Sequence, residues 1–203
     1  MNQLSAYECW QPYDLAEVAR LCVGLDWILA GGQALAFFLG RKYRLHSDID
    51  LLIRRDDQEK ITQILEPQKL FIATQPGILT PLDSQKYYES PIQDIWGLNA
   101  DSTAWGLQMM LFDVVNDAWV YKRHPAIKLP LSQIYFEKEG IKAVKPEIQL
   151  LYKSKTIRPR DQLDFETIVS ALDDEARQWL LNALDTCYGQ THIWSGYLKK
   201  LVK

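Results

Sequence analysis

Several features that mark other classes of protein are scarce in this chain. It has only three cysteines, widely spaced and without a C-x-x-C pair, namely Cys9, Cys22 and Cys187. Its three histidines are equally scattered, with no H-x-x-x-H pair, at His46, His124 and His192. The cysteine spacing excludes a disulfide framework and a zinc knuckle, and a reducing compartment fits it. The histidine spacing gives no support to zinc hydrolase chemistry.

Positive charge and long apolar runs are also lacking. There are 23 basic and 26 acidic residues, a net charge of -3, which argues against a surface built to coat a polyphosphate backbone. The longest apolar stretch, residues 23–40, is interrupted by Asp26, Gln33 and glycines and is barely membrane-length. The first ten residues lack the basic head and apolar core of a secretory signal. We therefore expect a cytoplasmic protein with no membrane partner.

The composition is that of a folded globular protein. The 203 residues are 47% apolar and 24% charged, enough for a substantial core in one or two domains. Strand and helix patterns both occur up to residue 125, although residues 68–104 have no sustained period. Beyond residue 125 four segments have helical spacing, at 147–155, 163–172, 175–184 and 193–201. The sequence predicts an α+β domain over residues 1–125 and a helical region over residues 126–203.

A double glycine lies between a predicted strand and a predicted helix. Residues 27–30 form a short apolar run, Gly31 and Gly32 break it, and residues 34–39 continue as an apolar helix. Free backbone N–H groups and the helix dipole at such a turn favour a phosphate. A plain steric turn explains two glycines equally well, so the pair alone is ambiguous.

Two aspartates alternate with apolar residues in the predicted strand 47–53. Asp48 and Asp50 project from one side of such a strand, with roots roughly 6 to 7 Å apart. Two neighbouring carboxylates are costly without a cation, and hard oxygen ligands at this separation suit Mg²⁺. Exposed aspartates bound only by water are the alternative. The glycine turn upstream, one helix and a basic loop away, favours the metal interpretation.

Together these residues resemble a known superfamily. The segment GGQALAFFLGRKYRLHSDIDLLI, with Gly31-Gly32 and the H-x-D-I-D-L pattern, resembles nucleotidyltransferases related to DNA polymerase beta. Within them it is most similar to the bacterial aminoglycoside and lincosamide nucleotidyltransferase branch, with weaker similarity in residues 117–125 and 146–168. The resemblance implies a mixed β-sheet flanked by helices and followed by a helical region. Many members have Gly-Ser at the turn, whereas the double glycine is usual in this branch.

The resemblance also implies residue roles. Gly31, Gly32, Ser47 and Arg44 are expected to contact the nucleotide, together with a lysine from the helical region. Lys155 is our candidate for that lysine, although basic residues at a helix end complement the helix dipole without any ligand. Two Mg²⁺ ions and ATP or another NTP are the implied cofactor and co-substrate.

A third carboxylate from a neighbouring strand is implied as metal ligand or base. Asp113 is our candidate, because it is the one acid in the apolar run LQMMLFDVV, where an unpartnered charge would be expensive. Asp117 is the rival, but its predicted position in a turn has a local explanation. Three further acids in the poorly patterned segment and its surroundings stay open, namely Asp83, Asp94 and Asp101.

Four aromatic residues are candidates for the wall of an acceptor pocket, although core packing explains them equally well: Tyr87, Tyr88, Trp96 and Trp105. The predicted reaction transfers AMP from ATP to a hydroxyl of a small molecule, such as an aminoglycoside- or lincosamide-like antibiotic. Alternatives are a toxin- or antitoxin-type nucleotidyltransferase that modifies tRNA or protein, a non-catalytic nucleotide-binding module, and a D-x-D glycosyltransferase. The sequence leaves the acceptor, the preferred nucleotide and the oligomeric state open.

Overall fold

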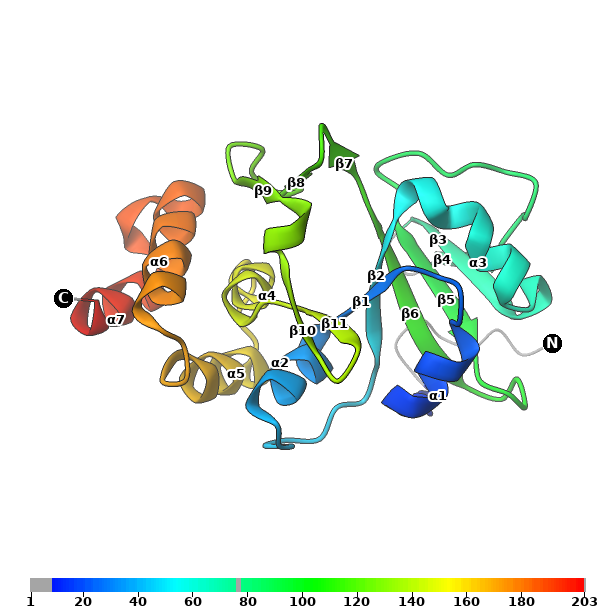
Figure 1. The fold of residues 1–203 in the computed structure, drawn as a ribbon, viewed down its shortest axis with the longest axis horizontal. Helices are drawn as coiled ribbons and strands as arrows, with labels where there is room; N and C mark the ends of the chain where they lie inside the picture. The colour runs from blue at the N-terminus through cyan, green and yellow to red at the C-terminus, as the bar shows by residue number, and fades with distance from the viewer. Residues whose placement is uncertain (1–8, 76–77, 203) are drawn as a thin grey trace. The chain divides into compact units, whose positions relative to one another are not determined.

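The protein is described here by a computed structural model that covers residues 9–75 and 78–202 (Figure 1). Its contacts divide into two compact units. The first unit contains the described residues up to Gln33 together with Arg44–Val114. The second contains Ala34–Tyr43 and the described residues from Val115 onward. The division therefore lies after Val114, whereas the sequence predicted a boundary at residue 125.

The first unit is built on a mixed sheet with strand order β1-β2-β6-β5-β3-β4. The β2–β6 pair is parallel, and the other described pairings are antiparallel. The strands are β1 (Trp27–Ala30), β2 (Asp50–Arg54), β3 (Leu70–Gln75), β4 (Ile78–Pro81), β5 (Asp94–Leu98) and β6 (Trp105–Phe112). Helical segments in this unit are α1 (Leu15–Leu21), η1 (Arg55–Asp57), α3 (Gln58–Ile64) and η2 (Pro67–Lys69). The predicted α+β class with a mixed sheet is confirmed.

Alternation along the strands separates the two faces of this sheet. One face of β1, β2 and β6 carries fully buried side chains, among them Leu29, Leu51 and Met109. The helices of the unit contribute Val18 from α1 and Ile61 from α3, both 0% exposed, to the same apolar core. The opposite face carries the polar residues at alternate positions. This separation decides which acids lie together.

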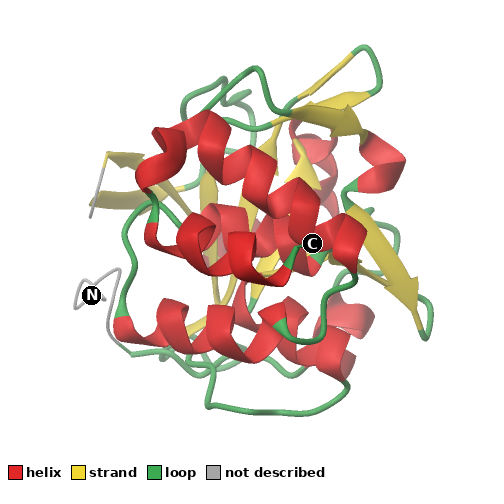
Figure 2. Cartoon of the chain, turned by 90° about the vertical axis from the view of Figure 1, so that its left-hand side faces the viewer, coloured by secondary structure: helices red, strands yellow, loops and turns green. Residues whose placement is uncertain are grey.

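The second unit contains most of α2 (Gly31–Leu39), several short strands and the C-terminal helices. A hairpin pairs β10 (Tyr135–Lys138) with β11 (Ile141–Val144), and β8 (Ala118–Val120) pairs with β9 (Lys128–Pro130). The helices are α4 (Pro146–Lys153), α5 (Pro159–Val169), α6 (Asp174–Tyr188) and α7 (Ile193–Leu201). Figure 2 looks onto these helices, with the C-terminus marked among them. Two short helical turns, η3 (Leu131–Gln133) and η4 (Gly189–Thr191), complete the unit.

The four predicted C-terminal helices are all present, but residues 126–203 are not helical throughout. Strands β9, β10 and β11 occupy parts of residues 128–144. The turn between β10 and β11 has positive φ at Glu139 (54°) and Gly140 (74°), which closes a tight hairpin. Four-residue strands give too short an alternation to stand out beside the helical spacing that follows. The predicted turn at Asn116 and Asp117 is confirmed, since both residues have positive φ.

Candidate functional site

The double glycine joins β1 directly to α2. Strand β1 ends at Ala30, and α2 begins at Gly31, whose φ is +66°. A Cβ at Gly31 would overlap the carboxylate of Asp50. The antiparallel register explains this contact, since Ala30 pairs with Asp50. The turn therefore needs glycine for its backbone conformation and for the acid that lies against it. The backbone N–H groups in the first turn of α2 have no hydrogen-bond partner within the helix, so they can bind an anion.

A basic loop lies against the second glycine of the turn. A Cβ at Gly32 would overlap the imidazole of His46 and the guanidinium of Arg44. The same guanidinium donates a hydrogen bond of 3.0 Å to the carbonyl of Leu45. Arg44, one of the predicted nucleotide ligands, therefore does lie at the turn. His46 also lies at the turn, and no role was predicted for it, although it is the histidine of the H-x-D-I-D-L pattern.

The two aspartates of the motif flank a buried isoleucine. Ile49 is 1% exposed, and its carbonyl accepts a 2.9 Å hydrogen bond from the backbone N–H of Gln108. Asp48 and Asp50 are half-buried, and Asp50 is the first residue of β2. The strand thus begins three residues later than predicted, with Asp48 just ahead of it. Ser47 lies exposed in the preceding loop.

A third acid lies on the sheet face of Asp50. Gln108 on β6 pairs in parallel with Asp50 and in antiparallel with Trp96 on β5. Asp94 is two residues before Trp96 and therefore shares its face. The Gln108 side-chain amide donates a 3.2 Å hydrogen bond to the Asp94 carboxylate. With strands about 4.8 Å apart and a rise of about 3.3 Å per residue, Asp50 and Asp94 lie about 12 Å apart at their backbones, with the side chain of Gln108 between them.

Asp113, our sequence-based candidate for the third carboxylate, lies elsewhere. It follows the last residue of β6 and is five positions beyond Gln108, about 16 Å along the strand direction. Its carboxylate pairs with Arg55, at 2.5 Å from Nε, and Arg55 also donates to the carbonyls of Tyr88 and Ile92. The Arg55 side chain is 7% exposed. Asp113 therefore neutralises a buried guanidinium and is not brought to the aspartate pair.

The other acids left open by the sequence have local partners. Asp83 accepts a 3.0 Å hydrogen bond from the backbone N–H of Gln85. Hydrogen bonds from Thr103 hold the pKa of Asp101 below its ordinary value. Asp117 lies exposed in the turn after β7 (Val114–Val115). Of the candidates for a third carboxylate, Asp94 is the one that the sheet places beside the motif.

The lysine predicted to reach the phosphates belongs to the second unit. Lys155 lies exposed, two residues beyond the end of α4. Lys153, by contrast, is buried and pairs with two acids of α5, at 3.0 Å from Asp164 and 3.3 Å from Asp161. Tyr43 donates a 2.7 Å hydrogen bond to Asp164. Lys153 is thus engaged in a buried ion cluster, and the role of Lys155 stays a prediction.

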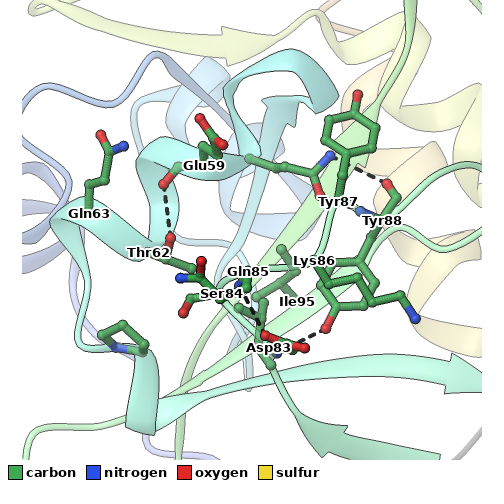
Figure 3. Close-up of a pocket in the computed structure, with 13 residues that line it drawn as sticks. Glu59, Thr62, Gln63, Asp83, Ser84, Gln85, Lys86, Tyr87, Tyr88 and Ile95 are labelled. Carbon is green, nitrogen blue, oxygen red and sulfur yellow. Dashed lines mark hydrogen bonds between the residues drawn. The ribbon is translucent and has the colours of Figure 1, made fainter.

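The four aromatic candidates divide between two environments. Trp96 and Trp105 pack edge to face with centroids 5.5 Å apart and are buried. Tyr87 and Tyr88 line a polar hollow of about 430 Å³ between α3 and the segment before β5 (Figure 3). Ile95 also lines this hollow, and its side chain points to the face of β5 opposite to Asp94. The hollow therefore lies on the other side of the sheet from the acids.

The acids suit a hard cation by their chemistry. Carboxylate oxygens are the ligands that Mg²⁺ takes from proteins, usually one or two of them, with water and substrate phosphates completing the shell. Within residues 9–75 and 78–202, no cluster of three or more Asp, Glu, His or Cys side chains could by itself hold a metal ion. In the same residues no helix is long and apolar enough to cross a membrane.

Comparisons with known proteins agree with this fold and turn. Residues 15–77 match the aminoglycoside-2''-adenylyltransferase family. The solved structure of the lincosamide antibiotic adenylyltransferase LnuA with lincomycin bound is similar, with 17% identity, a TM-score of 0.56 and coverage of 81% of this chain and 100% of that one. The complex of ANT(2'')-Ia with adenylyl-2''-tobramycin gives 13% identity, a TM-score of 0.53 and coverage of 83% and 94%. No curated protein sequence matches the chain.

The chain is therefore similar to nucleotidyltransferases, in sequence over residues 15–77 and in its fold over most of its length. The matched residues contain the glycine turn and both aspartates of the motif. The predicted resemblance to the aminoglycoside and lincosamide branch of that class is thereby confirmed.

Proposed function

We propose that the protein transfers a nucleoside monophosphate, AMP from ATP, to a hydroxyl of a small antibiotic molecule of the aminoglycoside or lincosamide type. The observation that carries this proposal is the contact of the Asp50 carboxylate with Gly31, which places an acid beside a helix N-terminus. A cation held by the acid and phosphates held by the amides would then be neighbours. A nucleoside triphosphate with its metal has that distribution of charge.

The nucleotide is assigned to the residues around the turn. The amides that follow Gly31 donate to phosphate oxygens, and the guanidinium of Arg44 lies beside Gly32, where it adds positive charge. Ser47 and Lys155 stay in the proposal as further nucleotide ligands, on the strength of the resemblance. These groups position the phosphates and do not react themselves.

Asp94 replaces Asp113 as the proposed third carboxylate. It shares a sheet face with Asp50, and the amide of Gln108 fixes one of its oxygens at 3.2 Å. A carboxylate held in this way accepts the proton of the acceptor hydroxyl as that oxygen attacks the α-phosphorus. The bond to the departing pyrophosphate breaks in the same displacement. Gln108 contacts no reacting atom and acts as a positioning residue.

Mg²⁺ is the proposed cofactor, held by Asp48 and Asp50 with Asp94 as a further ligand. When bound, two ions would neutralise charge on the phosphates and on the entering and leaving oxygens. Each carboxylate supplies oxygen donors, and no softer ligand lies in the motif apart from His46. The residues present therefore fit this ion.

The acceptor class comes from the family match over residues 15–77 and from the similar fold of LnuA and ANT(2'')-Ia. The test is incubation with each NTP carrying label at the α-phosphate, in the presence of Mg²⁺, against aminoglycosides, lincosamides, tRNA and protein. We expect label from ATP on an antibiotic, with release of pyrophosphate. Label on tRNA or protein alone would contradict the acceptor assignment, and nucleotide binding without transfer to any acceptor would contradict the enzymatic proposal.

A further inference from the structure

The second unit contains a cavity of about 420 Å³ that the proposed reaction does not use. Residues of α2, β10, α4 and α6 line it, and none of them is among the predicted nucleotide or metal ligands. Its size falls within the range of cavities that bind small molecules. We refer to it as the second-unit cavity.

Aromatic side chains form part of its wall. Phe38 from α2 and Phe136 from β10 pack edge to face, with centroids 5.9 Å apart. Trp179 from α6 also lines the cavity, and all three residues are half-buried. Half-buried aromatic faces offer both apolar contact and the negative face of the ring to a ligand.

The charged residues of the wall are mainly acidic. Glu147, Asp173 and Glu175 line the cavity against a single basic residue, Lys145. This balance disfavours a nucleotide or any other anion. Asp173 has a structural role as the N-cap of α6, where it accepts a 2.8 Å hydrogen bond from Ala176. Glu175 lies in the first turn of the same helix, which the helix dipole favours.

Glu147, in the first turn of α4, is the least exposed acid of the wall. It is nine-tenths buried, and the hydrogen bond that lowers its pKa comes from its own backbone N–H. Burial raises the pKa of Glu147 above its ordinary value. The negative charges of Asp173 and Glu175 also raise this pKa, whereas the positive charge of Lys145 lowers it. In the described part of the chain, no lysine or arginine forms an ion pair with it. A buried carboxylate of this kind is costly without a cationic partner.

We propose that the second-unit cavity binds a small organic cation, with its protonated amine at Glu147 and its apolar body against Phe38, Phe136 and Trp179. The carboxylate supplies a charge-assisted hydrogen bond, and the aromatic rings supply dispersion and cation–π attraction. This site goes beyond the proposed nucleotidyl transfer, because its lining includes none of the residues assigned to the nucleotide or the metal.

The test is titration calorimetry with n-hexylammonium, with 1-hexanol as the uncharged probe of equal length. We expect saturable binding of the amine, binding of the alcohol weaker by about ten-fold or more, and weaker amine binding as the pH is lowered, because protonation removes the charge of Glu147. Glu147→Gln should weaken amine binding by about the same factor. The matched control is Glu137→Gln on β10, an exposed acid of the same unit, which should bind as the unchanged protein does.

A thermal melt accompanies each variant. If Glu147→Gln does not fold, Trp179→Leu tests the aromatic wall with the charge intact, and weaker amine binding is again expected. Equal binding of amine and alcohol, or unchanged amine binding in the variants that fold, would overturn the proposal.

Discussion

At the scale of single residues, Asp94 is the acid whose removal should affect chemistry most selectively. Asp94→Asn keeps the size of the side chain but removes the base, so turnover should fall by about 10²- to 10⁴-fold. The KM for ATP should change much less, because the phosphates are assigned to the glycine turn and Arg44. Steady-state kinetics with a transferable acceptor measure both quantities. Unchanged turnover would show that another group takes the proton.

Asp113 should behave in the opposite way. Its carboxylate neutralises Arg55, whose side chain is 7% exposed, while Asp113 itself is about half exposed to solvent. Because solvent screens this pair, we expect Asp113→Asn to lower the free energy of unfolding by about 1–2 kcal/mol. Turnover per folded molecule should stay unchanged. Denaturant unfolding and an activity assay on the same sample separate the effects, and a large loss of turnover without a loss of stability would reinstate Asp113 in the site.

Asp161 makes part of the stability of the second unit depend on pH. Burial by itself raises the pKa of this carboxyl, but hydrogen bonds from Arg158 and the charge of Lys153 outweigh it and hold the pKa below its ordinary value of 3.8. The folded state thus binds this proton less readily than the unfolded chain does. Its stabilising contribution is complete above the ordinary value and is lost as the pH falls through the depressed pKa.

Unfolding by denaturant over a series of acidic pH values tests this assignment. Asp161→Asn should be less stable than the unchanged protein at neutral pH, and its stability should fall less steeply below about pH 4. Parallel pH dependence in the two proteins would contradict the role of Asp161.

At the scale of elements, the β1–α2 turn is the feature most sensitive to a single methyl group. Gly31→Ala places a Cβ onto the Asp50 carboxylate and strains a residue whose φ is +66°. Gly140→Ala is the matched control, because its φ of +74° is equally strained but no atom lies within 4 Å of the added Cβ. We expect Gly140→Ala to lose about 1 kcal/mol of stability, Gly31→Ala to lose more because of the added overlap, and only Gly31→Ala to lose nucleotide transfer per folded molecule. Equal transfer in the two variants would remove the turn from the site.

The sequence predicted those elements whose signals are local. The apolar run 27–30, the glycine pair and the alternation around Asp48 and Asp50 each lie within a few residues, and the structure contains the corresponding strand, turn and strand. The C-terminal helices were likewise predicted from helical spacing. The hairpin of β10 and β11 was missed because each strand has only four residues.

The acid beside the motif could not be predicted in the same way, because its place depends on strand order. Asp94 lies on the same sheet face as Asp50 because β5 pairs with β6 and β6 pairs with β2. Asp113 was predicted to have a partner because it is a charged residue in an apolar run, and the structure contains such a partner. That partner is Arg55, 58 residues earlier in the chain, which no local pattern indicates.

At the scale of the whole molecule, the fold is similar to that of solved structures with divergent sequences, and the local motif carries the specific resemblance. Identity to the similar solved structures is 13–17%, although they are covered almost completely. The overall fold is therefore similar although most side chains differ. The acceptor contacts are expected to differ with them, which is why the acceptor must be found by experiment.

The most direct test of the account is a Mn²⁺ titration followed by electron paramagnetic resonance, with a non-transferable ATP analogue present. It reports on the metal and nucleotide together and needs no acceptor. We predict that the unchanged protein and Asp113→Asn bind Mn²⁺ in a nucleotide-dependent manner, and that Asp50→Asn does not while keeping its thermal melt. Nucleotide-dependent Mn²⁺ binding that survives Asp50→Asn, or that is lost in Asp113→Asn, would contradict the account.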